Sequence, residues 1–193
     1  MIEVVDNLLP KKFADTLEDS VNSFNLQWYW NDGVVGSHEI LFPTDNTINV
    51  PQFVHNAYLS EFNSSSDFYL KIFPLYYFAE EKFNIDIEQV WRCKVNLLYK
   101  NLEAKDKHHP IHRDKRDSNS NSFSIIYYPE DSDGDTLFFD DTLKIVSQVK
   151  PKKNRAVLFN SNNLHCSSSP LKHNKRTAIN FVFAGEKNDL PSN

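Results

Sequence analysis

Hydrophobic residues recur along the first part of the chain with a period typical of helices. After Pro10, which suits the first turn of a helix, an apolar stripe continues at intervals of three to four residues. The stripe consists of Phe13, Leu17, Val21 and Phe24. We predict an amphipathic helix with this stripe in the protein core, preceded by a short strand at Ile2–Val5.

A second helical pattern follows further along the chain. The run Asn63–Asp67 is rich in residues that cap helix N-termini, and apolar residues then recur at helical spacing up to Phe83. Pro74 interrupts or kinks this helix because proline lacks a backbone N–H. Between the two helical patterns, residues 27–30 are aromatic and read as extended chain. We expect residues 34–51 to form a loop with one short strand.

The hydrophobic period changes to two after Asn84, which is typical of strands. Polar and apolar residues alternate from Val90 to Tyr99, which predicts a half-buried strand. Short β-rich segments then follow at residues 123–128, 136–139, 144–149, 155–159 and 177–183. Such spacing is typical of a β-sandwich or barrel. We predict one domain over residues 1–193, with a helix-rich support at 1–88 and a β-rich core at 89–184.

Composition and charge narrow the classes of function. The 21 basic and 26 acidic residues give a net charge of −5, which disfavours a dedicated nucleic-acid-binding protein. No apolar run approaches the ~18 residues of a transmembrane helix, and the N-terminus does not resemble a secretory signal. We therefore expect a soluble, cytoplasmic protein without a membrane partner. The two cysteines, Cys93 and Cys166, are expected to be small buried hydrophobes.

The candidate chemistry centres on His112-Arg113-Asp114. A histidine and a carboxylate two residues apart on an extended segment point to the same side of the chain. His165, from a distant strand, would complete a set of two imidazoles and one carboxylate, the facial triad of non-haem Fe(II) oxygenases. A His-x-Asp motif alone has little specificity, so the hypothesis depends on its context.

Four other histidines are weaker candidates for ligands. His108 and His109 are adjacent on an extended chain and face opposite ways, so at most one of them could approach the metal. We expect His38 and His55 to be surface or hydrogen-bonded histidines. The sequence therefore leaves the triad as its main candidate site.

Five features in a fixed order give the motif its context. They are His112-Arg113-Asp114, the strand end Ile126-Tyr127-Tyr128-Pro129-Glu130, the turn Asp133-Gly134-Asp135-Thr136-Leu137-Phe138, the segment Pro151–Phe159, and His165 followed by Arg176. Residues 90–184 thereby resemble the prolyl-4-hydroxylase-like branch of the 2-oxoglutarate/Fe(II) dioxygenases. The sequence departs from that pattern at three positions. Pro129 replaces a leucine of the family, and Asp135 and Asn154 each replace a glycine. Asparagine tolerates the left-handed backbone conformation that glycine supplies.

The resemblance implies a fold and a set of ligands. The fold would be α+β and mainly β, a double-stranded β-helix (jelly roll) with N-terminal supporting helices. Fe(II) would be held by His112, Asp114 and His165, with 2-oxoglutarate and O₂ as cosubstrates and ascorbate as an accessory reductant.

The resemblance also suggests residues for the cosubstrate. Arg176 would bind the far carboxylate of 2-oxoglutarate, because a guanidinium can donate two parallel hydrogen bonds to it. Lys175 is a rival at the adjacent position. Tyr128 and Tyr99 are candidates to hydrogen-bond the cosubstrate, and the alternative for each is a tyrosine of the protein core. Thr136 and Asn180 are further candidates for lining the pocket.

The implied reaction is hydroxylation of a substrate C–H bond with release of succinate and CO₂. The substrate would be a peptidyl proline or another amino-acid side chain, or else a free amino acid or small metabolite. The polar loops 101–109 and 115–122 would gate the open face. Two alternatives remain open: a non-catalytic jelly roll that keeps a relic or structural metal site, and a cupin-like metalloenzyme that acts without 2-oxoglutarate.

Overall fold

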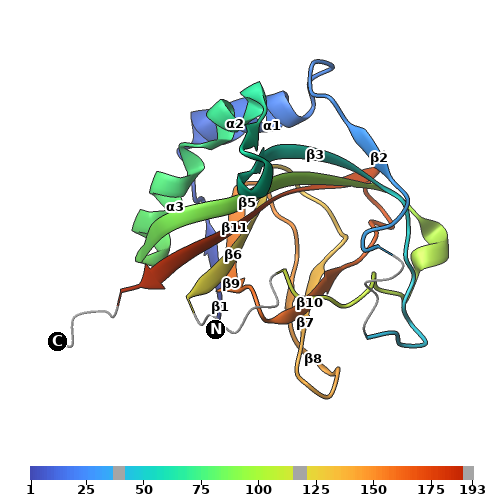
Figure 1. The fold of residues 1–193 in the computed structure, drawn as a ribbon. Helices are drawn as coiled ribbons and strands as arrows, with labels where there is room; N and C mark the ends of the chain where they lie inside the picture. The colour runs from blue at the N-terminus through green and yellow to red at the C-terminus, as the bar shows by residue number, and fades with distance from the viewer. Residues whose placement is uncertain (37–41, 115–120, 189–193) are drawn as a thin grey trace.

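The computed structural model describes residues 1–36, 42–114 and 121–188, and two antiparallel sheets dominate it (Figure 1). The larger sheet has 8 strands. Its order is β1 (Ile2–Asp6), β9 (Arg155–Asn160), β6 (Ser122–Tyr128), β11 (Lys175–Lys187), β5 (Ile85–Tyr99), β3 (Gln52–Leu59) and β2 (Tyr29–Asn31), with β4 (Ser64–Ser65) paired to β3. Strands distant in sequence are thus neighbours in space.

The smaller sheet has 3 strands in the order β10 (Leu164–Ser167), β7 (Thr136–Phe139) and β8 (Ile145–Val149). Two isolated bridges extend this sheet: His112 pairs with His165, and Ile111 pairs with Phe42. The two sheets enclose the cavity described below. This arrangement is the predicted jelly roll, α+β and mainly β, and the fold class is confirmed.

Helices cover the other face of the larger sheet (Figure 1). They are α1 (Lys11–Val21), α2 (Asp67–Ile72) and α3 (Leu75–Phe83), with short 3₁₀ turns at Ser60–Phe62 and Leu102–Ala104. Pro74 separates α2 from α3, as its missing N–H predicts. Apolar residues of the helices, such as Leu17 and Ile72, pack with Cys93 and Phe181 of the sheet in the main core.

One prediction about the core is wrong. Ala14, Leu17 and Val21 of α1 are buried, but Phe24 is fully exposed at 107%. The helix ends at Val21, and Asn22 caps it, so the helical spacing that would have turned Phe24 inward no longer applies.

The N-terminal 88 residues contribute strands as well as helices. β1 pairs with β9 at one edge of the larger sheet, and β3 pairs with β5 near the other. β5 begins at Ile85, so the expected boundary between residues 88 and 89 falls inside a strand. The division into support and core therefore stays a prediction.

The two cysteines are unpaired and buried, as expected. Burial raises the pKa of the Cys93 thiol and of the Cys166 thiol, so neither has the thiolate character of a reactive cysteine. Across the described residues, no helix is both long enough and apolar enough to cross a membrane.

Candidate active site

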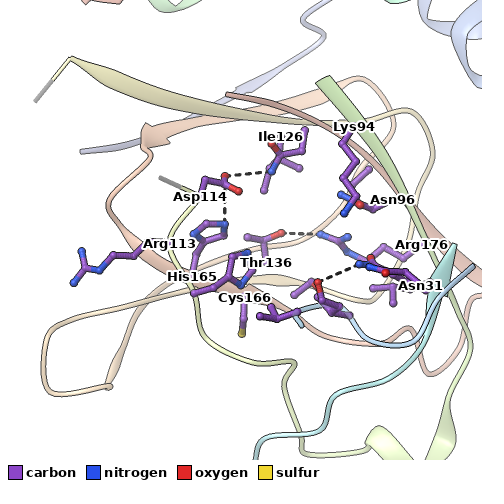
Figure 2. Close-up of a pocket in the computed structure, with 18 of the residues that line it drawn as sticks. Asn31, Lys94, Asn96, Arg113, Asp114, Ile126, Thr136, His165, Cys166 and Arg176 are labelled. Carbon is purple, nitrogen blue, oxygen red and sulfur yellow. Dashed lines mark hydrogen bonds and ion pairs between the residues drawn. The ribbon is translucent and has the colours of Figure 1, made fainter. Parts of the chain in front are cut away.

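A cavity of about 340 Å³ lies between the two sheets (Figure 2). Alternate residues of the larger sheet form one wall, because side chains of a strand point alternately to its two faces. From β5 they are Arg92, Lys94, Asn96 and Leu98, and from β11 they are Arg176, Ala178 and Asn180. The residues between them, such as Cys93, Val95 and Phe181, belong to the core beneath the helices.

The opposite wall carries the predicted ligand group. His112 and His165 exchange two backbone hydrogen bonds of 3.0 Å each, and the amide of Asp114 donates to the Ser161 carbonyl at 3.0 Å. One possible ligand atom from each of His112, Asp114 and His165 lies within 4.8 Å of the other two. The structure thus brings together the three side chains that the His-x-Asp spacing and the distant histidine predicted.

Backbone carbonyls orient both imidazoles. The Nδ1 of His112 bonds to the Pro110 carbonyl at 3.0 Å, and that of His165 bonds to the Asn163 carbonyl at 2.9 Å. Because a carbonyl only accepts, Nδ1 carries the proton and Nε2 keeps its lone pair for a metal. Burial and the neighbouring His165 lower the pKa of His112 to about 4, which keeps this ring neutral at pH 7.

Asp114 is held in the ionised form. Arg92 donates to its Oδ1 at 2.6 Å, while Ser124 and Asn180 donate to its Oδ2 at 2.7 Å and 3.3 Å. Burial alone would raise the pKa of Asp114, but the charge of Arg92 and the hydrogen bond from Ser124 hold it well below its usual range. Two neutral imidazoles and one carboxylate are the donor set of the non-haem Fe(II) facial triad, so these residues fit that metal.

Arg176 is a buried cation in the same cavity. Its Nε donates to the Gly134 carbonyl at 2.6 Å and its Nη2 donates to Thr136 Oγ1 at 2.8 Å, a contact drawn in Figure 2. Tyr128 shares a 2.7 Å hydrogen bond with the same Thr136 hydroxyl, and its ring centre lies 5.6 Å from the guanidinium carbon. Among the ion pairs formed within residues 1–36, 42–114 and 121–188, none includes Arg176.

Gly134 is required for this arrangement. A Cβ at that position would lie 2.5 Å from the Ser168 carbonyl oxygen and 2.9 Å from Cδ of Arg176. Any other residue would push the arginine or the backbone away. The Asp-Gly-Asp-Thr turn therefore positions Arg176 as well as Thr136. Because the buried guanidinium forms no ion pair with a carboxylate of the described residues, it is suited to bind an anion.

The rival residues lie elsewhere. Lys175 pairs with Glu130 at 3.0 Å and does not line the cavity. Tyr99 is 59% exposed, and its ring packs edge-on against Phe53 at 5.7 Å. The structure therefore brings Arg176 and, through Thr136, Tyr128 to the site, but it does not bring Tyr99 or Lys175 there.

The remaining histidines have structural partners. The ring of His55 bonds to the Gln27 carbonyl and to Ser66 Oγ, at 2.8 Å and 2.7 Å, as expected for a hydrogen-bonded histidine. His108 and His109 bond to hydroxyl and carbonyl groups, and neither belongs to the ligand group. Burial, aided by the charge of Arg176, lowers the pKa of His109 to about 3. His38 lies outside the described residues.

Arg92 and Ser124 contact Asp114 but were not predicted as site residues. The signal for Arg92 was the period-two pattern of β5, which places Arg92, Lys94 and Asn96 on one face. A half-buried strand is expected to expose its polar face to solvent, whereas this polar face lines the cavity. Thr136 and Asn180 line the cavity as expected.

Of the two expected gating loops, the first is well anchored. The amide of His108 donates to the Asn46 carbonyl at 2.9 Å, and that of His109 donates to the Ser167 carbonyl at 2.8 Å. Most of the second loop, residues 115–120, lies outside the described residues. The gating role of both loops stays a prediction.

Residues 97–184 match the model of the 2OG-Fe(II) oxygenase superfamily. This segment belongs to that superfamily. It contains the three candidate ligands and Arg176, and the superfamily implies Fe(II), 2-oxoglutarate and O₂ and supports an oxidoreductase. No curated protein sequence gives a significant match to the chain.

Solved structures share the fold of this chain. A prolyl-4-hydroxylase from Pseudomonas putida is 14% identical with a TM-score of 0.57, covering 97% of this chain and 93% of that one. A Trichoplax adhaerens prolyl hydroxylase, in complex with a hypoxia-inducible-factor peptide, is 14% identical with a TM-score of 0.58, covering 95% and 83%. The 2-oxoglutarate-dependent epimerase SnoN of nogalamycin biosynthesis is 12% identical with a TM-score of 0.59, covering 99% and 85%. At these identities the likeness concerns the fold alone.

Proposed function

We propose that this protein is an Fe(II)- and 2-oxoglutarate-dependent dioxygenase that hydroxylates a C–H bond of an amino-acid side chain, with peptidyl proline as the first candidate. Succinate and CO₂ are the coproducts. One observation carries the proposal. Two imidazoles and an ionised carboxylate share a single cavity with Arg176, a buried cation that forms no ion pair with an acidic residue among the described residues.

Each residue has a defined role in this proposal. His112 and His165 bind Fe(II) through Nε2, and Asp114 binds it through a carboxylate oxygen. Arg176 binds the far carboxylate of 2-oxoglutarate, and Tyr128 orients Arg176 through Thr136. When bound, iron and 2-oxoglutarate supply the oxidising power that couples decarboxylation to insertion of one oxygen atom into the substrate.

The rest of the cavity supports a substrate with polar groups. Beyond the ligand group, the wall formed by β5 presents Lys94 and Asn96 next to Leu98. A peptide fits such a mixed surface, and the Trichoplax neighbour was solved with a peptide. A small molecule is the second candidate, because the fold also serves an epimerase of antibiotic biosynthesis.

Succinate formation from 2-oxoglutarate tests the proposal. The purified protein should form succinate only when both Fe(II) and O₂ are present, and His112→Ala, Asp114→Ala and His165→Ala should each abolish this turnover. The matched control is His108→Gln, because His108 lies near the site but outside the ligand group. Its activity should stay close to that of the wild type. The same assay with and without ascorbate tests whether ascorbate is an accessory reductant.

The alternatives give different results in this assay. Metal binding without any turnover would indicate a structural or relic site, and oxidation without 2-oxoglutarate would indicate a cupin-like enzyme. Peptides and metabolites that increase succinate formation can then be analysed by mass spectrometry for a gain of one oxygen atom. A prolyl peptide that gains none while a small metabolite does would move the substrate to the second class.

A further inference from the structure

Arg92 connects the two sheets at the metal-ligand group. It lies on β5 of the larger sheet, whereas Asp114 lies in the segment that pairs with β10 of the smaller sheet. Its Nη2 donates to Asp114 Oδ1 at 2.6 Å, and the carboxylate side chain is only 3% exposed. A charge-assisted hydrogen bond this short, to a sequestered carboxylate, is a strong contact.

The two oxygens of Asp114 have different surroundings. Oδ1 accepts from Arg92, whereas Oδ2 accepts from Ser124 at 2.7 Å and from Asn180 at 3.3 Å and also faces Nε2 of His165 at 3.6 Å. Figure 2 marks the contact between Asp114 and His165. Oδ2 is therefore the oxygen turned toward the histidine ligands, and Oδ1 is turned toward Arg92.

One nitrogen of the Arg92 guanidinium lacks a partner among the described residues. Its Nε is buried and has no hydrogen-bond partner. A buried N–H without a partner is unfavourable, so the surrounding protein does not by itself explain why the guanidinium lies here. The hydrogen bond to Asp114 is the contact that accounts for this placement of the guanidinium.

We propose that Arg92 is a positioning residue for the metal: by occupying Oδ1, it makes Asp114 a one-oxygen ligand through Oδ2. A carboxylate that bound through both oxygens would take one of the three positions that a facial triad leaves open. Those positions are needed for the two chelating oxygens of 2-oxoglutarate and for O₂. This inference rests on the proposed function and adds a residue that the His-x-Asp and histidine motifs do not contain.

A purely electrostatic role for Arg92 predicts the opposite result. A guanidinium beside the site repels a divalent cation, so removing only its charge would tighten metal binding. Removing a positioning residue that orients a ligand instead weakens metal affinity by about 10- to 100-fold. The sign of the change therefore separates the two roles.

The experiment is a titration of the apoprotein with Mn(II), an ion that does not react with O₂ in this setting. Binding is monitored through the electron paramagnetic resonance signal of the free ion. Arg92→Met, which keeps most of the side-chain length, should weaken Mn(II) binding about 10- to 100-fold. Arg92→Lys should recover part of the loss, because an ammonium can still donate to Oδ1. The matched control is Arg155→Met, which removes a 2.6 Å bond from an arginine to Asp6, neither of which lines the cavity, and should leave the affinity unchanged.

The outcomes are distinguishable. If wild-type protein does not bind Mn(II), the proposed function fails and this inference fails with it. If wild-type protein binds Mn(II) but Arg92→Met binds it equally or more tightly, only the role of Arg92 is overturned. Should Arg92→Met not fold, Arg92→Gln gives the decision by the same titration, because its shorter neutral side chain cannot maintain the charged contact and should also bind Mn(II) at least about tenfold more weakly.

Discussion

Adjacent residues on β11 have opposite surroundings, which favours one of the two candidates for binding the carboxylate of 2-oxoglutarate. Arg176 points into the cavity and Lys175 points to the other face, where it pairs with Glu130. We predict that Arg176→Ala raises the 2-oxoglutarate concentration needed for half-maximal succinate formation by about 10- to 100-fold, since hydrogen bonds to a charged group contribute roughly 1.5–3 kcal/mol. Steady-state kinetics at saturating Fe(II) measure this change.

Lys175→Ala is the control for that prediction, because it removes a neighbouring cation without touching the cavity. It should change the half-saturating concentration by no more than about twofold, because the ion pair between Lys175 and Glu130 lies outside the cavity lining. Metal affinity should be unchanged in both variants. A large effect of Lys175→Ala with none of Arg176→Ala would show that the carboxylate site is assigned one residue too far along the strand.

At this scale, the sequence predicts what is local. His112 and Asp114 are two residues apart on an extended segment, so their common direction follows from strand geometry alone. The contact of Arg92 with Asp114 depends on how two sheets face each other, which no local pattern contains. The position of Tyr99, in contrast, follows from the local pattern. The strand period places Tyr99 on the same face as Leu97 and on the opposite face from Arg92, and the residue lies outside the cavity with 59% of its surface exposed.

Strands that alternate strongly or consist of buried β-branched and aromatic residues were predictable, and others were not. The segment predicted at 136–139 is β7 itself. β10 is only four residues long, Leu-His-Cys-Ser, between polar runs, and it becomes a strand because it pairs with β7. β3 follows Pro51 and includes His55 and Asn56, and it pairs with β5 on one side and with β2 and β4 on the other. Whether such segments form strands depends on pairing with a neighbouring strand and not on their intrinsic propensity.

The loop before β11 depends on one carboxylate. Asp133 accepts hydrogen bonds from the backbone amides of Leu171, Lys172 and His173, at 3.1 Å, 2.8 Å and 2.9 Å. Burial opposes the charge, but these amides and the His173 ring hold the pKa of Asp133 well below its usual range. Asp133 thus connects the Asp-Gly-Asp-Thr turn to the loop that leads into Arg176.

We predict that Asp133→Ala weakens 2-oxoglutarate binding about tenfold and destabilises the fold by about 2 kcal/mol, because three backbone donors lose a charged acceptor. Isothermal titration with 2-oxoglutarate and urea unfolding measure the two effects. Asp140→Ala is the matched control, since Asp140 caps the turn at Thr142 and Lys144 in the same way. It should reduce stability without weakening 2-oxoglutarate binding. Equal effects of both variants on 2-oxoglutarate would mean that Asp133 acts only through general stability.

Over the whole molecule, the N-terminal segment is attached to the sheet core by polar contacts between residues far apart in the chain. Asn154 has a left-handed φ of 64°, and its amide side chain accepts from the Leu9 N–H at 2.9 Å and donates to the Leu9 carbonyl at 2.8 Å. The substitution of asparagine for the family's glycine thus keeps the left-handed turn and adds this attachment. Its tolerance of that conformation was predictable from the sequence, but its partner 145 residues away was not.

Asp6 makes the second attachment, and it is sensitive to pH. Arg155 donates to its carboxylate at 2.6 Å, and Lys152 donates at 2.9 Å. The hydrogen bonds from Arg155 and then Lys152 lower the pKa of Asp6 from 3.8 to about 2. A depressed pKa in the folded state means that the contribution to stability is complete above about pH 4 and is lost as the pH falls through about 2.

Asp6→Asn should therefore destabilise the protein at about pH 5 and much less at about pH 2, where roughly half of the wild-type carboxylate is itself protonated. Because 36% of the Asp6 side chain is exposed, solvent screening limits the expected difference at the higher pH to about 1 kcal/mol. Urea unfolding of both proteins across this range measures it. A difference that stays constant down to about pH 2 would show that the amide side chain perturbs packing instead of merely removing the ion pairs. The attachment of β1 to β9 would then rest on the backbone ladder alone.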